Sequence, residues 1–249
     1  MRSLENWLTD EMIEGNGDYK MENGRIYGVS VGPGNPELMT LMAVRVIREA
    51  DVIALPHEKK EKCVAYQIAR QVLPEMDQKD CLLISMPMTK DPLQLEQSHR
   101  QGAERILKCL KQGKNVALIT LGDVSVYSTC WYLYRLVKEA GAKGELISGV
   151  PSFCAAAARM DRALVSGSQE LHILPASYQI EEGLELPGVK VLMKPGKHMA
   201  SLKEELLRRK VTACGIQRCG MDGEQIYRTA EEIREDAGYY SLFIVDGNE

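Results

Sequence analysis

The feature that most constrains the fold is an alternation along the first two thirds of the chain. Apolar runs of strand type cover residues 25–32, 51–56, 81–87, 115–122 and 144–149. Segments with helical spacing of apolar residues cover 35–50, 63–74, 94–113, 128–141 and 152–160. Strands and helices that alternate with short connections form a parallel sheet covered by helices. This part of the chain is therefore predicted to be a parallel α/β domain.

The first helical segment carries a start signal. Asn35 is a residue type that caps helices, and Pro36 after it suits the first helical position. The sequence predicts a helix that begins at Pro36.

The pattern changes near residues 165–168, a stretch of Ser and Gly. Closely spaced strand-like runs follow at 170–176, 188–194, 212–219, 224–229 and 239–247, with helices predicted only at 201–209 and 229–236. Such spacing favours a mixed or antiparallel sheet. We therefore predict an α/β protein of two domains with a cofactor cleft between them: a tail at 1–22 with a short helical pattern, an N-terminal domain at 23–166 and a C-terminal domain at 167–249.

Composition excludes some classes of function. The chain of 249 residues has 31 basic and 35 acidic residues, a net charge of −4, and only 6% aromatic residues. These values argue against a nucleic-acid-binding protein, which needs a cationic face or stacking aromatics. The longest uncharged stretch, 146–158, is too short to span a bilayer, and the acidic N-terminus lacks the apolar core of a signal peptide. We expect no membrane contact and a cytoplasmic protein.

The seven cysteines include no C-x-x-C pair, and the four histidines are scattered. Most cysteines lie among apolar residues, so buried free thiols are expected. No metal site is predicted.

Three turns follow predicted strands, at residues 28–34, 121–129 and 148–153. The first has neither the G-x-G-x-x-G spacing of dinucleotide-binding turns nor the lysine of a phosphate loop. In the second, Gly122 lets the backbone approach a ligand, Asp123 caps a helix or faces a cation, and Ser128 and Thr129 supply hydroxyls. Open α/β sheets bind ligands at such strand ends, but a purely structural turn remains an alternative at each.

The three turns, in this order, resemble those of the tetrapyrrole methylases, which use S-adenosylmethionine. The similar segments are GRIYGVSVGPGNPELMTLMAVRVIREADVIALP, LITLGDVSVYST and ISGVPSFCAAAAR, and the resemblance extends from Gly24 to Gly247. Val124 and Ser148 stand where the family has proline. A proline fixes φ, so these two loops lose that constraint.

Two further segments, SMPMTKD before the long helix and GSQELHILPA, resemble the subfamily that methylates carbon 20 of precorrin-2 or of its cobalt complex, cobalt-factor II. The resemblance implies a class III methyltransferase of cobalamin biosynthesis, with the substrate on the N-terminal domain and the cofactor on the C-terminal one. It also implies a homodimer, for which Trp131–Tyr134 supplies aromatic surface. Alternatives are a related enzyme acting on another ring carbon, on a diphthine precursor or on ribosomal RNA, and a cofactor-binding sensor without turnover.

The resemblance also implies site residues. Cofactor contacts are expected from Pro33, Gly122, Asp123, Val126, Ser128, Thr129, Ser152, Phe153, Met193, Arg218 and Tyr240. Carboxylates of the macrocycle call for cations, and the candidates are Lys90, Arg100, Arg159 and Lys194, with Arg162, Lys197 and Arg218 as further possibilities. Tyr127 is a candidate catalytic residue for orienting the substrate or removing a proton. If Asp123 faces the cation of the cofactor, Asp123→Asn should fold normally and bind the cofactor about tenfold more weakly.

Overall fold

The computed structural model describes residues 23–87, 89, 91–177 and 180–247. The tail predicted over residues 1–22, its short helical pattern and the candidate residue Lys90 lie outside the described residues. The described chain divides into two compact units, one formed by residues 23–31 and 39–149, the other by residues 32–38 and 150–247.

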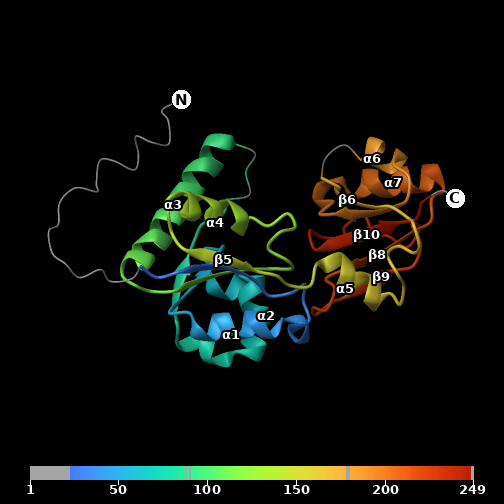
Figure 1. Ribbon diagram of the computed structural model, residues 1–249. Coiled ribbons are helices and arrows are strands. Elements are labelled where there is room, and N and C mark those ends of the chain that lie inside the picture. The colour runs from blue at the N-terminus through green and yellow to red at the C-terminus, as the bar shows by residue number, and fades with distance from the viewer. Residues whose placement is uncertain (1–22, 88, 90, 178–179, 248–249) are drawn as a thin grey trace, which may run out of the picture. The chain divides into compact units, whose positions relative to one another are not determined.

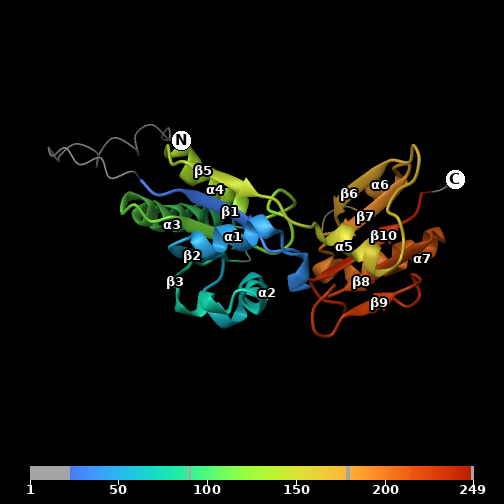
Figure 2. The ribbon, with the colours of Figure 1, turned by 60° about the horizontal axis from the view of Figure 1, so that its bottom comes forward.

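The first unit is built on a parallel sheet, as predicted. Its strands are β1 (Ile26–Ser30), β2 (Val52–Leu55), β3 (Asp80–Leu83), β4 (Val116–Thr120) and β5 (Gly144–Ile147), in the order β3-β2-β4-β1-β5. Every neighbouring pair is parallel. Figures 1 and 2 show α1 (Leu41–Glu49) and α2 (Val64–Val72) on one face, and α3 (Pro92–Lys111) and α4 (Cys130–Glu139) on the other. Short 3-10 helices lie at Pro36–Leu38, Lys60–Lys62 and Pro74–Gln78.

The packing of this unit explains why its strands are continuous apolar runs in the sequence. All residues of β2 and β4 are buried, because helices cover both faces of the sheet. On the α3/α4 face, Ile106 and Leu133 pack with Ile26 and Leu118 in one cluster.

The prediction that the first helix begins at Pro36 is wrong. Pro36–Leu38 forms a single 3-10 turn, and α1 begins at Leu41. Thr40 is the N-cap, and its hydroxyl accepts a hydrogen bond from the Ala43 N–H at 3.2 Å. The Asn35 side chain caps only the short turn, accepting from the Glu37 N–H at 2.9 Å. Thr40, which was not predicted as a cap, lies five residues after Asn35 and starts the helix that packs on the sheet.

The second unit contains the predicted mixed sheet. Its strands are β6 (Leu171–Pro175), β7 (Val189–Met193), β8 (Ala213–Gln217), β9 (Gln225–Tyr227) and β10 (Ser241–Val245), in the order β6-β7-β10-β8-β9. Only β6 and β7 pair in parallel. The helices are α5 (Ser152–Arg159), α6 (Glu181–Glu185) and α7 (Met199–Arg209), with a 3-10 turn at Gly196–His198. Figure 1 shows α6 and α7 on one side of this sheet and α5 on the other.

The helix predicted at 229–236 is wrong, since turns occupy this segment. Its apolar residues Ala230 and Ile233, at helical spacing, are buried in the cluster beside Leu206 and Phe243. Both residues enter the core from turns, so the helical spacing of these apolar residues did not indicate a helix here. The short helix α6 was not predicted.

The division between the units differs from the boundary expected at residues 165–168. Helix α5, which precedes that boundary, belongs to the second unit, and so does the segment 32–38 that follows β1. Two ion pairs join α5 and the turn after it to other residues of the second unit: Arg159 pairs with Glu224, and Arg162 pairs with Asp246. The predicted roles of the two domains, and the cofactor cleft, stay predictions.

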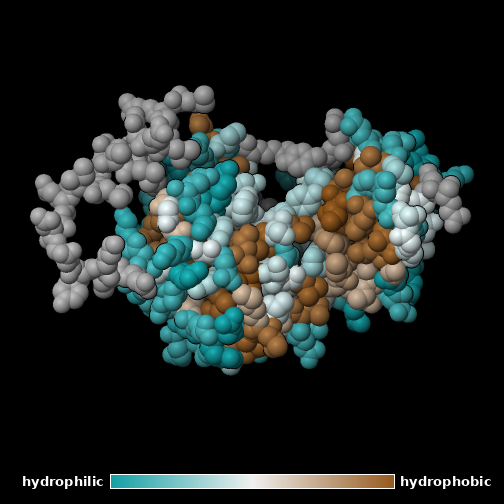
Figure 3. Space-filling view, in the orientation of Figure 1, coloured by the Kyte–Doolittle hydropathy of each residue, from teal (hydrophilic) through white to brown (hydrophobic). Residues whose placement is uncertain are grey.

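The surface over α3 is mainly hydrophilic in Figure 3, as its run of charged residues requires. Among the described residues, no helix combines the length and apolar character that crossing a membrane requires.

Candidate functional site

The order in which successive strands are added to the first sheet reverses between β1 and β4, so the carboxyl ends of these two strands form its topological switch point. The chain leaves β1 through α1 toward β2, which lies beyond β4, and leaves β4 through α4 toward β5, which lies beyond β1. Crevices at such points are where doubly wound sheets place ligands. All three turn motifs of the sequence begin at the ends of β1, β4 and β5. This edge is therefore the candidate site of the first unit.

Asp123 lies at this edge and is 7% exposed. One carboxylate oxygen accepts the Gly149 N–H at 2.7 Å, and the other accepts the Ser125 N–H at 2.8 Å and the Ser125 hydroxyl. Burial works to raise the pKa of this carboxyl, but the hydrogen bonds from Gly149 and Ser125 outweigh burial and lower the pKa below its ordinary value. The charged carboxylate thus joins the loop after β4 to the loop after β5.

Of the two alternatives for Asp123, the one in which it caps the following helix is wrong. Helix α4 begins at Cys130, with Thr129 as the N-cap residue. The Asp123 side chain instead forms an Asx turn with Ser125 and reaches the neighbouring loop at Gly149.

A second hydrogen bond holds the same loop against the end of β1. The Val124 N–H donates to the Ser30 hydroxyl at 2.9 Å, and both residues are buried. A proline at position 124 has no N–H to give, so valine supplies a hydrogen bond in place of the fixed φ that the family's proline provides. Gly149 lies against the same serine, and a Cβ at Gly149 would overlap the Cβ of Ser30.

Gly122 has open space beside its main chain. Its φ is +73°, and although the residue is buried, a Cβ added there would meet nothing within 4 Å. Open space therefore lies beside the main chain, which suits the close approach of a cofactor.

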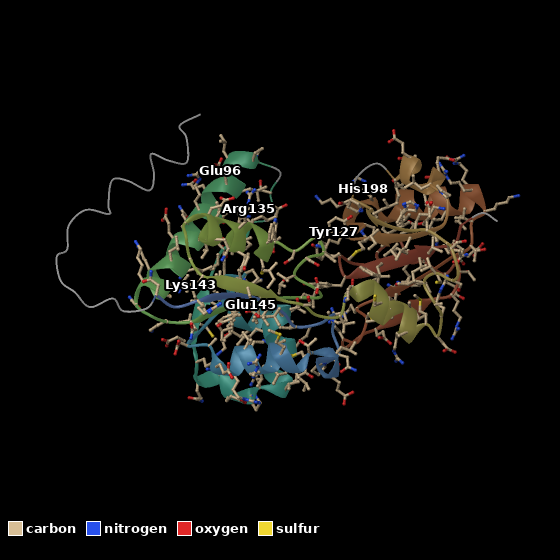
Figure 4. All side chains as sticks on the ribbon, in the orientation of Figure 1. Glu96, Tyr127, Arg135, Lys143, Glu145 and His198 are labelled. Carbon is tan, nitrogen blue, oxygen red and sulfur yellow. The ribbon has the colours of Figure 1, made fainter. Side chains whose placement is uncertain are left out.

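The other predicted residues of this loop differ in their surroundings. Ser128 is committed to the fold, because its hydroxyl lies 3.0 Å from that of Thr120 and accepts the Cys130 N–H at 3.3 Å. Val126 is half-buried and Thr129 is exposed. Tyr127 is 44% exposed, has a φ of +46° and lies on the loop between β4 and α4 (Figure 4).

In the second unit, the segment that contains Pro33 packs on the loop after β8. A Cβ at Gly34 would overlap the carbonyl oxygen of Cys219, and one at Gly220 would lie 2.5 Å from the Asn35 nitrogen. Glycine is therefore required at both positions for the two chain segments to touch. Pro33, next to Gly34, is buried.

Three further predicted cofactor residues lie at one edge of the second sheet. Met193 ends β7, Arg218 follows β8, and Tyr240 precedes β10, which lies between those strands. The N–H of Arg218 donates to the Tyr240 carbonyl at 2.8 Å. Ser152 and Phe153 are the first residues of α5, where Phe153 is buried and Ser152 half-buried.

The predicted substrate cations that the structure describes have contacts within the protein. Arg100 donates to Glu96, one turn earlier on α3, at 2.7 and 3.1 Å. Arg159 donates to Glu224 at 2.7 Å. Lys194 lies with its ammonium 5.6 Å from the centre of the Tyr239 ring. The charges of Arg100 and Arg159 are thus met by carboxylates within the protein.

Sequence reasoning missed Ser30, Ser125 and Gly149 as parts of this network. Two signals could have found them. Ser30 is a polar residue that closes an otherwise apolar strand, and Ser125 follows Asp123 by two positions, the spacing of an Asx turn.

The cysteines are free thiols. Cys63, Cys130 and Cys219 are buried, and burial raises the pKa of Cys130 to about 12. Cys81, Cys109 and Cys214 are half-buried and Cys154 is exposed, so fewer thiols are buried than expected. Within the part of the chain that the structure describes, no group of three His, Cys, Asp or Glu residues is placed to hold a metal ion.

A parallel α/β unit with three turns at its strand ends, together with a mixed α/β unit, defines a protein of the two-domain α/β class. The family model for Tetrapyrrole (Corrin/Porphyrin) Methylases matches residues 25–233. The chain belongs to this family, which confirms the resemblance seen in its turns.

Relatives are similar over most of the chain. A probable cobalt-precorrin-2 C(20)-methyltransferase of Methanocaldococcus jannaschii is 35% identical over 171 residues, which are 68% of this chain and 72% of the relative. The cobalt-precorrin-2 C(20)-methyltransferase of Salmonella typhimurium is 30% identical over 234 residues, 90% of this chain and 97% of the relative. The uroporphyrin-III C-methyl transferase of Thermus thermophilus, solved with S-adenyl homocysteine, shares the fold with a TM-score of 0.68 at 19% identity, covering 90% of this chain and 97% of that one.

Proposed function

We propose that the protein transfers a methyl group from S-adenosylmethionine to carbon 20 of precorrin-2 or of its cobalt complex, in cobalamin biosynthesis. The observation that carries this proposal is the identity of 30% over nearly the whole length of a relative named for that reaction. The family match over residues 25–233 supports it independently. Both relatives named above carry cobalt in their names, which favours the cobalt complex as substrate.

The chemistry asks the protein mainly to position its two reactants. The cofactor supplies a methyl group already activated by a positive sulfur, and the nucleophile is an electron-rich carbon of the macrocycle. Holding reactants in line contributes about 7–11 kcal/mol in favourable cases. A rigid strand edge provides such positioning, so the hydrogen bonds that fix the loops at 121–125 and 148–149 belong to the catalytic design.

For the cofactor, we propose the edge formed by β1, β4 and β5 together with the predicted contacts of the second unit. The open space beside Gly122 fits the close approach of a ligand to main chain. Asp123 would act by holding the two loops that bound this space, and Tyr127 on the same loop remains the candidate for orienting the macrocycle. The roles of all these residues are proposals.

A turnover assay tests the function. The purified protein is incubated with S-adenosylmethionine and either the metal-free or the cobalt-loaded macrocycle, and both the demethylated cofactor and the mass of the tetrapyrrole are followed. We expect one methyl group to be added, faster on the cobalt complex. Cofactor binding without any macrocycle methylation would instead identify the sensor, and a diphthine or RNA substrate would identify another branch of the family.

We also propose a homodimer that uses the exposed part of α4. Trp131 and Tyr132 are 43% and 47% exposed, whereas Leu133 and Tyr134 on the same helix are buried. Sedimentation at micromolar concentration should give about twice the chain mass of 27.8 kDa. A species of 27.8 kDa would contradict the dimer.

A further inference from the structure

We propose that Lys190, in the second unit, is a carbamylation site, at which the side-chain amine adds carbon dioxide and the resulting carbamate is held by groups of β6 and α7. The site stands apart from the proposed methyl transfer. It lies near the amino-terminal ends of β6 and β7, whereas the predicted cofactor residue Met193 ends β7.

Lys190 is the only basic side chain that is buried among the described residues, with 3% of the residue exposed. It is the second residue of β7 and shares a face of the sheet with Leu192, which packs in the core with Leu202 and Leu206 of α7. Its paired residue on β10 is Val245, which is also buried. The stem of this lysine therefore lies in the apolar core beneath α7.

The ammonium of Lys190 has no acidic partner. The charged residues that face it from α6 and α7 are Glu185 and Arg209, but these two pair with each other, and none of the described carboxylates forms an ion pair with the lysine. Burial first, and then the positive charge of Arg209, lower the pKa of Lys190, and Glu185 opposes them only in part. The amine thus loses its proton more readily than an exposed lysine does, and the neutral amine is a nucleophile.

A second nitrogen without a hydrogen-bond partner lies beside Lys190. Strands β6 and β7 are parallel, and their register pairs His172 with Lys190, so the two side chains are neighbours on the same face of the sheet. The His172 Nε2 is buried, and no described residue forms a hydrogen bond with it, although the Glu170 carboxylate lies 3.4 Å away. In the tautomer with the proton on Nδ1, this nitrogen can accept a proton.

The reaction needs carbon dioxide and a proton acceptor, and nothing is oxidised or reduced. The lone pair of the neutral Lys190 amine attacks the carbon of carbon dioxide, a C–N bond forms, and one C–O π bond becomes the second lone pair of a carboxylate. The nitrogen then gives one proton to His172 Nε2. The products are a lysine carbamate, which carries one negative charge, and an imidazolium.

The surroundings select this electrophile and stabilise its product. Carbon dioxide is small and uncharged, so it can reach an amine that the core leaves almost no room to approach. The carbamate replaces a positive charge near Arg209 with a negative one, which Arg209 and the protonated His172 attract. The Glu185 side chain is 72% exposed, so it can turn to solvent and yield Arg209 to the carbamate. An exposed lysine has no such cations around its carbamate.

NMR of the intact protein tests the site. Wild type, Lys190→Met and the control Lys111→Met, at an exposed position of α3, are equilibrated with ¹³C-labelled bicarbonate as the source of carbon dioxide. We expect a carbamate carbon signal in wild type that is lost in Lys190→Met and kept in the control. Lys190→Met should melt no lower than wild type, because methionine fills the space without a buried charge. A signal that Lys190→Met keeps, or no carbamate signal in wild type, would show that Lys190 is an inert buried amine and overturn the site.

Chemical trapping locates the carbamate independently. A trialkyloxonium salt converts carbamates to stable esters in the bicarbonate-treated protein, and peptide mass spectrometry then measures the ester at each lysine. Occupancy at Lys190 should exceed that at Lys111 at least about tenfold, and His172→Phe should lower it about tenfold, because the carbamate loses a cation and the amine its proton acceptor. Equal occupancy at the two lysines would overturn the site, and unchanged occupancy in His172→Phe would overturn the role of His172 in it.

Discussion

At the scale of single residues, Asp123 joins two loops through hydrogen bonds to both of its carboxylate oxygens. An asparagine has one acceptor oxygen, so in Asp123→Asn either the Gly149 N–H or the Ser125 N–H faces an amide NH₂. An unpaired buried donor costs about 1–3 kcal/mol, so we expect the free energy of unfolding to fall by about that amount in urea titrations without ligand. Normal stability, expected from the sequence, would contradict this account. Ser125→Ala is the control, because it removes only the hydroxyl donor and should cost less.

The lowered pKa of Asp123 gives this contribution a pH dependence. A carboxyl whose folded pKa lies below its unfolded value of about 3.9 stabilises the fold fully above that value. The contribution is lost as the pH falls through the lowered folded pKa. The stability difference between wild type and Asp123→Asn should therefore be constant near neutral pH and shrink below about pH 4. Unfolding curves recorded from pH 7 to pH 3 check this, and a gap that widens in acid would refute it.

At the scale of elements, the bond from Val124 to Ser30 ties the loop after β4 to the end of β1. Ser30→Ala leaves a buried N–H unpaired and should cost about 1–3 kcal/mol. In a Val124→Pro background that N–H is gone, so adding Ser30→Ala should cost almost nothing. A double-mutant cycle of unfolding free energies measures this coupling. Additive losses would show that the two residues do not act through this bond.

The segment 32–38 contacts the loop after β8 closely because Gly34 has no side chain. Gly34→Ala places a Cβ on the Cys219 carbonyl oxygen, so one segment must move. We expect a loss of about 1–3 kcal/mol in thermal unfolding, the usual cost of overpacking. Gly238→Ala is the matched control, since its Cβ would meet only the Gln217 side chain at 3.5 Å. Equal melting temperatures for the two variants would contradict this role of Gly34.

The sequence predicted every strand and the long helices because burial on one or both faces leaves a period in the apolar residues. It failed where local signals compete. Asn35 and Thr40 are both good caps, and only packing on the sheet decides that α1 begins after Thr40. Residues 229–236 have helical spacing, yet Ala230 and Ile233 reach the core from turns.

The turns of the candidate site could be predicted from the sequence, because each turn is signalled by residues within one short segment. The hydrogen bonds that define it were not. Asp123 and Gly149 are 26 residues apart, and Ser30 and Val124 are 94 apart. Such pairs depend on which strands become neighbours, here β1 between β4 and β5.

At the scale of the whole molecule, the chain passes between its two units more than once. It leaves the first after β1, contributes residues 32–38 to the second, and returns before α1. The turn that carries Pro33 and Gly34 thus belongs to a different unit from the strand that precedes it.

The position of the transferred methyl group decides whether the protein methylates carbon 20, as proposed. The protein is incubated with S-adenosylmethionine labelled with ¹³C in its methyl group and with the cobalt-loaded or metal-free macrocycle, and the product is examined by NMR. We predict a single new ¹³C methyl resonance that correlates with carbon 20. A label on any other ring carbon, or none with either macrocycle, would contradict the account.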